Sequence, residues 1–143
     1  AGLAREIADG ASIDTAPLTA IPDAPDPSCL RTTAWDGDET LNTSLFRSVC
    51  PVTGQPDYAT LVVRYRGPRI DRGSLLAYLA SYRRHAGFHE HCVERVFCDI
   101  AAACRPRALA VEARFTRRGG VDINPYRTNE PLWRARSAPD PRQ

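Results

Sequence analysis

Hydrophobic and polar positions alternate along two stretches of the chain, and this two-residue period is typical of half-buried β-strands. The first stretch predicts a strand over about residues 58–66, which a Gly-Pro pair at 67–68 would end, and the second predicts a strand over 109–115. A turn at 119–120 then precedes a further predicted strand that begins with residues 121–125, so the last two strands would form a β-hairpin. The alternating apolar positions are Leu61, Val63 and Tyr65 in the first strand and Leu109, Val111, Ala113 and Phe115 in the second.

Between these strands the apolar period lengthens to three or four residues, which indicates helices. Asp71 is a candidate cap for a first helix, and a second helix is predicted from about His89 to Cys104. Gly87 separates the two helices, and an Arg-Pro pair at 105–106 would stop the second. The order of strand, two helices and hairpin predicts an α+β fold, with an antiparallel sheet and two helices packed on one face. The apolar positions at helical spacing are Leu75, Leu76, Leu79 and Tyr82, then Val93, Val96, Phe97, Ile100 and Cys104.

The two ends of the chain lack these periods. Residues 1–38 are rich in Ala, Pro, Asp and Thr, which predicts a loosely structured lead-in or connector with one short strand near 12–14. We therefore expect one folded module over 39–129 and a frayed polar tail over 130–143.

Composition narrows the class of protein. The 143 residues suit one domain, and 43% hydrophobic and 25% charged residues are typical of a soluble globular protein. The net charge of +2 gives no electrostatic argument for direct nucleic-acid binding. No apolar run approaches the ~20 residues of a membrane span, and no segment resembles a signal peptide. Five cysteines without compact disulfide spacing indicate reduced thiols, so we expect a cytoplasmic protein.

Two amino acids are absent. There is no methionine, even at position 1, which predicts that the chain begins inside a longer or processed gene product. There is no lysine either, since all 19 basic residues are arginine, and this excludes a Schiff-base lysine and a Walker-type phosphate loop.

The octad Cys-Pro-Val-Thr-Gly-Gln-Pro-Asp, from Cys50 to Asp57, carries the most informative chemistry. Its prolines and glycine favour a fixed turn over a helix. A thiolate beside a proton donor can add to an electrophilic carbon and protonate the atom next to it. Each residue also has a structural explanation, Cys50 as a buried structural cysteine and Asp57 as a cap or turn residue.

A second cluster, Phe88-His89-Glu90, begins the second predicted helix. At this position the carboxylate of Glu90 could accept two parallel N–H bonds from a guanine-like base. The alternative is that Glu90 only interacts favourably with the helix dipole.

Two further groups of polar residues could bind a ligand, the first a metal ion and the second a phosphate group. The residues with metal-ligating side chains near the second cluster are His85, His89, His91 and Cys92. Gly87 interrupts the helix that would make their spacing useful and no Cys-x-x-Cys accompanies them, so we expect no metal site. Near the C-terminus, Arg117, Arg118 and Gly119 are suited to a phosphate group, although arginines in hairpin turns are also common.

Taken in order, these motifs resemble the nitrile reductases of queuosine biosynthesis, the 7-cyano-7-deazaguanine reductase (QueF) family. The resemblance covers roughly residues 40–129 and is closest to the C-terminal half of the two-module form. It implies the tunnelling fold, whose modules join into barrels with active sites at the joints. The stretches that carry it are 50–57, 88–90 and 118–120, together with 65–67, 70–72, 75–76, 89–95 and 116–125; residues 12–14 fit the segment between modules.

The resemblance also implies a role for each motif residue. Cys50 would attack the nitrile carbon and form a covalent thioimide, and Asp57 would donate the proton. His89 would assist proton transfer during reduction, Glu90 would hold the deazaguanine edge, and Phe88 would lie close to the base. Because a nitrile becomes an amine through two hydride transfers, two NADPH molecules would be consumed in each turnover.

One departure concerns the cofactor. The family has a lysine-containing Glu-Ser-Lys-Ser-like motif before the first helix, whereas residues 70–75 here contain no lysine. In two-module members this motif lies in the N-terminal module, so we expect NADPH binding to need that module. Because the modules of this fold join into barrels, we also expect a homo-oligomer. Arg117, Arg118 and Gly119 remain candidates for contact with the cofactor phosphate. Two alternatives stay open: an amidine-forming relative that adds ammonia to the same thioimide, and a non-catalytic deazapurine-binding module.

Overall fold

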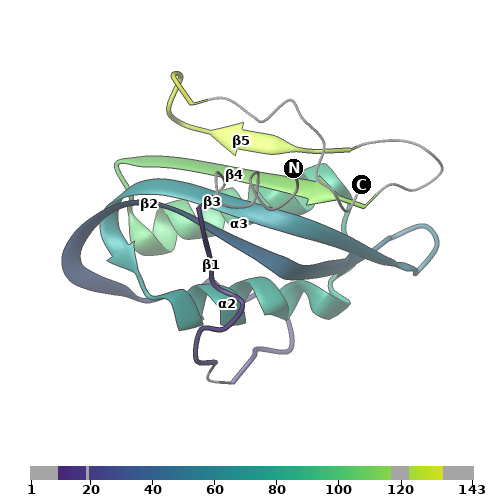
Figure 1. The fold of residues 1–143 in the computed structure, drawn as a ribbon. Coiled ribbons are helices and arrows are strands. Elements are labelled where there is room, and N and C mark those ends of the chain that lie inside the picture. Colours follow the sequence, from purple (N-terminus) through teal and green to yellow (C-terminus); the bar gives the residue numbers. More distant parts are fainter. Residues whose placement is uncertain (1–9, 19, 117–122, 134–143) are drawn as a thin grey trace.

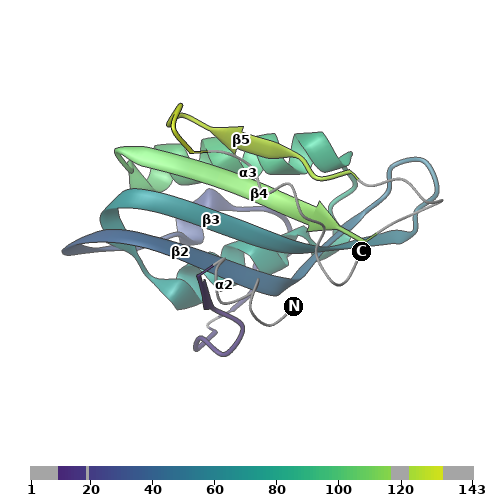
Figure 2. The ribbon, with the colours of Figure 1, turned by 45° about the horizontal axis from the view of Figure 1, so that its top comes forward.

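The computed structural model describes residues 10–18, 20–116 and 123–133. Within them, five strands form one sheet in the order β1-β2-β3-β4-β5, with β1 parallel to β2 and the other neighbours antiparallel. Helices α2 and α3 cover one face of this sheet (Figures 1 and 2), which confirms the expected α+β architecture. The elements are β1 (Ala11–Ser12), the 3-10 helix η1 (Pro27–Cys29), β2 (Thr32–Val49), β3 (Pro56–Ile70), α2 (Arg72–Ala80), the 3-10 helix η2 (Ser81–Arg84), α3 (His89–Cys104), β4 (Ala108–Phe115) and β5 (Tyr126–Thr128).

The core lies between the helices and the sheet. The odd-numbered positions from 59 to 65 in β3 and from 109 to 115 in β4 join the helices in one buried cluster, as the alternation in the sequence predicted. The buried residues of the two strands in this cluster are Ala59, Leu61, Val63, Tyr65, Leu109, Val111, Ala113 and Phe115, together with Ile70 at the end of β3.

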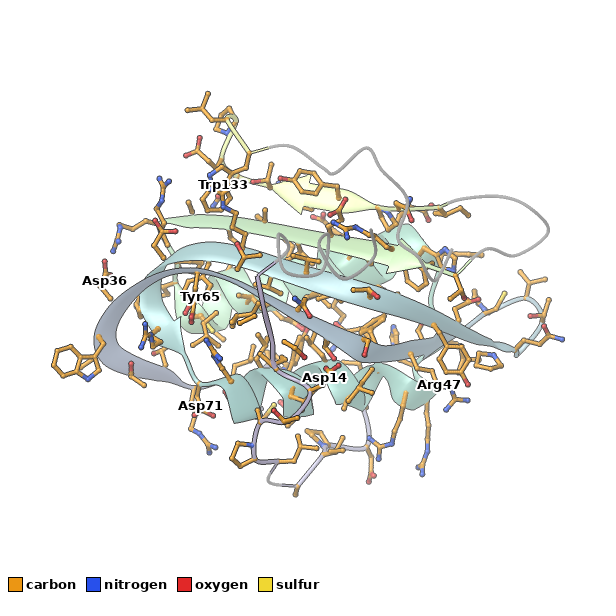
Figure 3. All side chains as sticks on the ribbon, in the orientation of Figure 1. Asp14, Asp36, Arg47, Tyr65, Asp71 and Trp133 are labelled. Atoms are coloured by element: carbon orange, nitrogen blue, oxygen red, sulfur yellow. The ribbon has the colours of Figure 1, made fainter. Side chains whose placement is uncertain are left out.

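Both predicted helices begin where their sequence signals lie. Asp71 caps α2 by accepting a hydrogen bond from the Ser74 N–H at 2.8 Å, and Figure 3 shows it at the start of this helix. α3 runs from His89 to Cys104 as predicted. It stops at Arg105, whose φ of 50° is left-handed.

The long strand β2 was not predicted. It runs without interruption through position 38, where the sequence analysis placed the end of the connector. Ile13, from the segment before β2, is 1% exposed in the core, and its N–H donates to the Asn42 carbonyl at 2.9 Å. The Asp14 carboxylate accepts hydrogen bonds from Thr43 and Ser44. The division into lead-in, module and tail stays a prediction, but part of the lead-in packs as core.

Two predicted strand boundaries were wrong. β3 continues past Gly67 to Ile70, because β4 starts opposite Arg66 and leaves Pro68 beside only one neighbouring strand, where proline is tolerated. β5 occupies Tyr126–Thr128 rather than beginning with 121–125, of which 121–122 lie outside the described residues. The shift follows from Pro125, which accepts a bond from Ala113 but has no N–H to donate.

One residue of the predicted tail, Trp133, packs against the other face of the sheet. This residue, labelled in Figure 3, is 6% exposed. It belongs to a small buried cluster with Ala108 and Ala110. The guanidinium carbon of Arg64 lies 4.0 Å from the centroid of its ring, which is a cation–π contact. Residues 134–143 lie outside the described residues.

Candidate active site

A cavity of about 390 Å³ opens where the end of β2, the start of β3 and the start of α3 meet. Five predicted site residues line it, and Gly87, Thr116 and Ile123 lie beside them. The other three predicted site residues, Arg117, Arg118 and Gly119, lie outside the described residues. The five are Cys50, Asp57, Phe88, His89 and Glu90.

A tight turn after β2 presents Cys50. Its N–H donates to the Gln55 carbonyl at 2.8 Å, and its carbonyl accepts from the Gly54 N–H at 2.9 Å. Gly54 has a φ of 73°, a left-handed conformation that glycine adopts without strain. The turn returns the chain into β3, so Asp57 lies opposite Ser48 in the antiparallel register. The thiol and the carboxylate therefore reach one cavity although seven positions separate them.

A short backbone bridge brings this turn beside α3. The Val49 N–H donates to the His85 carbonyl at 2.9 Å, and the Gly87 N–H donates to the Val49 carbonyl at 3.1 Å. A Cβ atom on Gly87 would lie 3.1 Å from His85 Nε2 and 3.2 Å from Cys92 Sγ, closer than most such contacts. Gly87 lies between the two helices. Because it has no side chain, its backbone can pack closely against His85 and Cys92 and form one wall of the cavity.

The surroundings of Cys50 favour its thiolate. A hydrogen bond from the Thr53 hydroxyl, then the backbone N–H groups of Thr53 and Val52, lower the pKa of Cys50, while the charge of Asp57 opposes this shift. The other four cysteines have raised pKa values, chiefly because burial penalises their charged form. Cys50 is therefore the one of the five cysteines whose surroundings favour the thiolate, which is the nucleophilic form of a thiol.

His89 and Asp57 meet inside the cavity. His89 Nε2 lies 3.3 Å from Asp57 Oδ2, with the side chains 15% and 8% exposed. The imidazole stacks on the Phe115 ring with centroids 3.7 Å apart and planes inclined by 4°. Its Nδ1 is buried and has no hydrogen-bond partner among the described residues. The imidazole and the carboxylate are therefore close enough for direct proton transfer.

Phe88 and Glu90 flank His89 at the start of α3. Phe88 is the residue before the helix and is 48% exposed, and Glu90 is an exposed acid in the first turn. Both line the cavity, so an aromatic ring and a hydrogen-bond acceptor border the space beside the thiol. The sequence analysis did not identify Thr53 or Phe115 as site residues, because their contacts depend on the folded turn and sheet.

Residues 10–18, 20–116 and 123–133 contain neither a metal-binding cluster nor a membrane-spanning helix. In these ranges no three His, Cys, Asp or Glu side chains gather closely enough to hold a metal ion. No helix in the same ranges has both the length and the apolar character that crossing a bilayer requires.

Fold and cavity together define an α+β module of the tunnelling-fold class with a cysteine-centred candidate active site. A family model described as "QueF-like protein" matches residues 56–132, and the chain belongs to this family.

Two curated relatives and one solved structure describe the similarity. The chain is 54% identical over 129 residues to the "NADPH-dependent 7-cyano-7-deazaguanine reductase" of Burkholderia vietnamiensis (strain G4 / LMG 22486), covering 89% of this chain and 47% of the relative. It is 57% identical over 122 residues to the protein of that name from Bordetella pertussis (strain Tohama I / ATCC BAA-589 / NCTC 13251), covering 85% and 45%. The chain thus spans about half the length of the curated relatives it matches. The crystal structure of the archaeosine synthase QueF-Like in the apo form shares the fold, with a TM-score of 0.55, 20% identity and coverage of 70% of this chain and 92% of that one.

Proposed function

We propose that this chain is the catalytic half of an NADPH-dependent nitrile reductase that converts 7-cyano-7-deazaguanine to 7-aminomethyl-7-deazaguanine in queuosine biosynthesis. The observation that carries the proposal is the convergence of Cys50, Asp57, His89, Glu90 and Phe88 on one cavity. The names of the relatives supply the substrate and the cofactor.

The first step is addition of the thiol to the nitrile. The thiolate of Cys50 forms an S–C bond to the nitrile carbon while one π bond of the nitrile breaks, and Asp57 donates a proton to the nitrogen. The product is a covalent thioimide. The lowered pKa of Cys50 supports this role, because it raises the fraction of thiolate at neutral pH.

Reduction to the amine requires two hydrides and two protons, and two NADPH would supply the hydrides. His89 lies 3.3 Å from Asp57, which supports a role for the imidazole in moving protons to and from this carboxyl group. Glu90 would accept N–H bonds from the deazaguanine edge, and Phe88 would cover a face of the base.

The described residues provide groups that could bind the proposed substrate but few that could bind the cofactor. None of the described residues that line the cavity is an arginine, so this part of the site does not fit the phosphate groups of NADPH. We propose that Arg117, Arg118 and Gly119 contact a cofactor phosphate, and that a separate N-terminal module supplies the rest of the site.

We further propose that the protein works in the cytoplasm as a homo-oligomer. Phe88 and Ile123 line the cavity but are 48% and 37% exposed, and a neighbouring module would remove this apolar surface from water.

Intact mass spectrometry of the chain mixed with 7-cyano-7-deazaguanine, without NADPH, tests the proposal. We expect an adduct with the mass of the substrate that disappears in Cys50→Ala and persists in Cys98→Ala, which removes an exposed thiol on α3. Adduct loss in both variants, or its retention in Cys50→Ala, would refute the role of Cys50. If the folded chain forms no adduct, even with an added N-terminal module, the nitrile-reductase proposal fails.

The amidine-forming alternative is favoured by one observation, the lack of a cationic partner for NADPH in the described lining. Turnover that consumes ammonia and no NADPH would establish it in place of the reductase. A chain that binds the deazapurine equally well with and without the Cys50 thiol, and never forms the adduct, would instead be a binding module.

A further inference from the structure

The His89 imidazole is held by one polar contact and one stacking contact. The polar contact joins Nε2 to Asp57 Oδ2 at 3.3 Å, and no described residue bonds to Nδ1. A single contact of this kind fixes which edge of the ring faces Asp57, but it leaves the plane of the ring free to turn about the Cβ–Cγ bond. A second contact is required to fix the plane of the ring.

Phe115 supplies that second contact. Its ring lies parallel to the imidazole, inclined by 4° with centroids 3.7 Å apart. The Nε2 lone pair or N–H lies in the imidazole plane, so a fixed plane directs it toward the Asp57 carboxyl group. Proton transfer depends strongly on such alignment, and a misplacement of about 1 Å can cost on the order of a hundredfold in rate.

Phe115 is itself held firmly by the sheet. It is 1% exposed, and it pairs across the sheet with Ala59, which in turn pairs with Phe46. Because alanine is small, the rings of Phe46 and Phe115 meet edge to face over it, with centroids 6.2 Å apart at 80°. The Thr116 N–H donates to the Tyr58 carbonyl at 2.9 Å and fixes the chain just after Phe115.

We propose that Phe115 is a positioning residue that sets the plane of the His89 imidazole against Asp57. The proposal rests on the role proposed above for His89. It assigns a function at the end of β4 to a residue whose sequence pattern indicates only a buried strand position.

Imidazole NMR signals of the chain without substrate test the geometry directly. The face of Phe115 should shift the ring protons of His89 upfield, and Phe115→Leu should move them downfield, toward the values of an imidazole that stacks on no ring. Phe97→Leu is the matched control. It also removes a buried phenylalanine ring, but this ring lies on α3, about 12 Å along the helix from His89. Unchanged His89 signals in Phe115→Leu, or equal changes in both variants, would overturn the proposal.

Rates of adduct formation test whether the positioning matters for chemistry. We expect Phe115→Leu to lower the maximal rate by about ten- to a hundredfold with an unchanged half-saturating substrate concentration. In a His89→Ala background the same substitution should have no further effect. An equal loss in both backgrounds would mean that Phe115 acts by another route and would refute the proposal. If His89→Ala alone does not change the rate of adduct formation, His89 takes no part in that step, and the NMR result decides the role of Phe115.

Discussion

Ile13 offers a sharp test of where the folded module begins. The sequence predicts a loose lead-in around this residue, whereas the structure buries its side chain to 1% exposure in the main core. Replacing Ile13 by alanine removes three carbon atoms from that core. At about 0.8 kcal/mol for each buried carbon group, plus the cost of the cavity, the loss of unfolding free energy should be about 3 kcal/mol.

The measurement is the free energy of unfolding from urea denaturation followed by circular dichroism, with thermal unfolding beside it. For a domain of this size, a loss of about 3 kcal/mol corresponds to a Tm lower by about 10 °C. Ile13→Val should cost only about 1 kcal/mol, because one carbon group is lost.

Leu18→Ala is the matched control, since this side chain lies nearby in sequence and is 46% exposed. We expect it to change stability by less than about 0.5 kcal/mol. If Ile13→Ala cost no more than Leu18→Ala, the segment before β2 would not be part of the core, and the connector predicted from sequence would extend through it.

Two further predictions concern hydroxyl groups. Thr53→Val removes the hydroxyl that most lowers the pKa of Cys50, so the pKa should rise and the pH profile of alkylation, which follows the thiolate, should move to higher pH; an unmoved profile would show that the hydroxyl does not stabilise the thiolate. Tyr78→Phe removes a buried hydroxyl that lies 2.7 Å from the Tyr82 hydroxyl and 2.6 Å from Asp99 Oδ2, so about 1–3 kcal/mol of unfolding free energy should be lost, and a loss below about 0.5 kcal/mol would contradict the network.

The parts of the fold that follow from short-range signals could be predicted from the sequence. α3 has a sustained apolar face and an Arg-Pro stop, and its bounds were predicted correctly. β2 could not be predicted, because an irregularity between Thr43 and Phe46 breaks its register and so its two-residue period. The burial of Ile13 could not be predicted either, because it depends on pairing with a strand that is distant in sequence.

The candidate site divides in the same way. The motif residues from Cys50 to Glu90 line one cavity, as expected if the motifs form one site. The stacking of Phe115 on His89 depends on how the end of β4 packs beneath α3, and no local pattern in the sequence encodes it.

The turn that carries Cys50 is held by main-chain hydrogen bonds, from Cys50 to Gln55, from Gly54 to Cys50, and between Val49 and the segment before α3. None of these bonds uses the sulfur atom. A Cys50→Ala variant should therefore keep the shape of the cavity while losing the ability to react. Such a variant is a suitable template for crystallising the cavity with the proposed nitrile substrate left unreacted, and for screening ligands that bind there without forming a covalent bond.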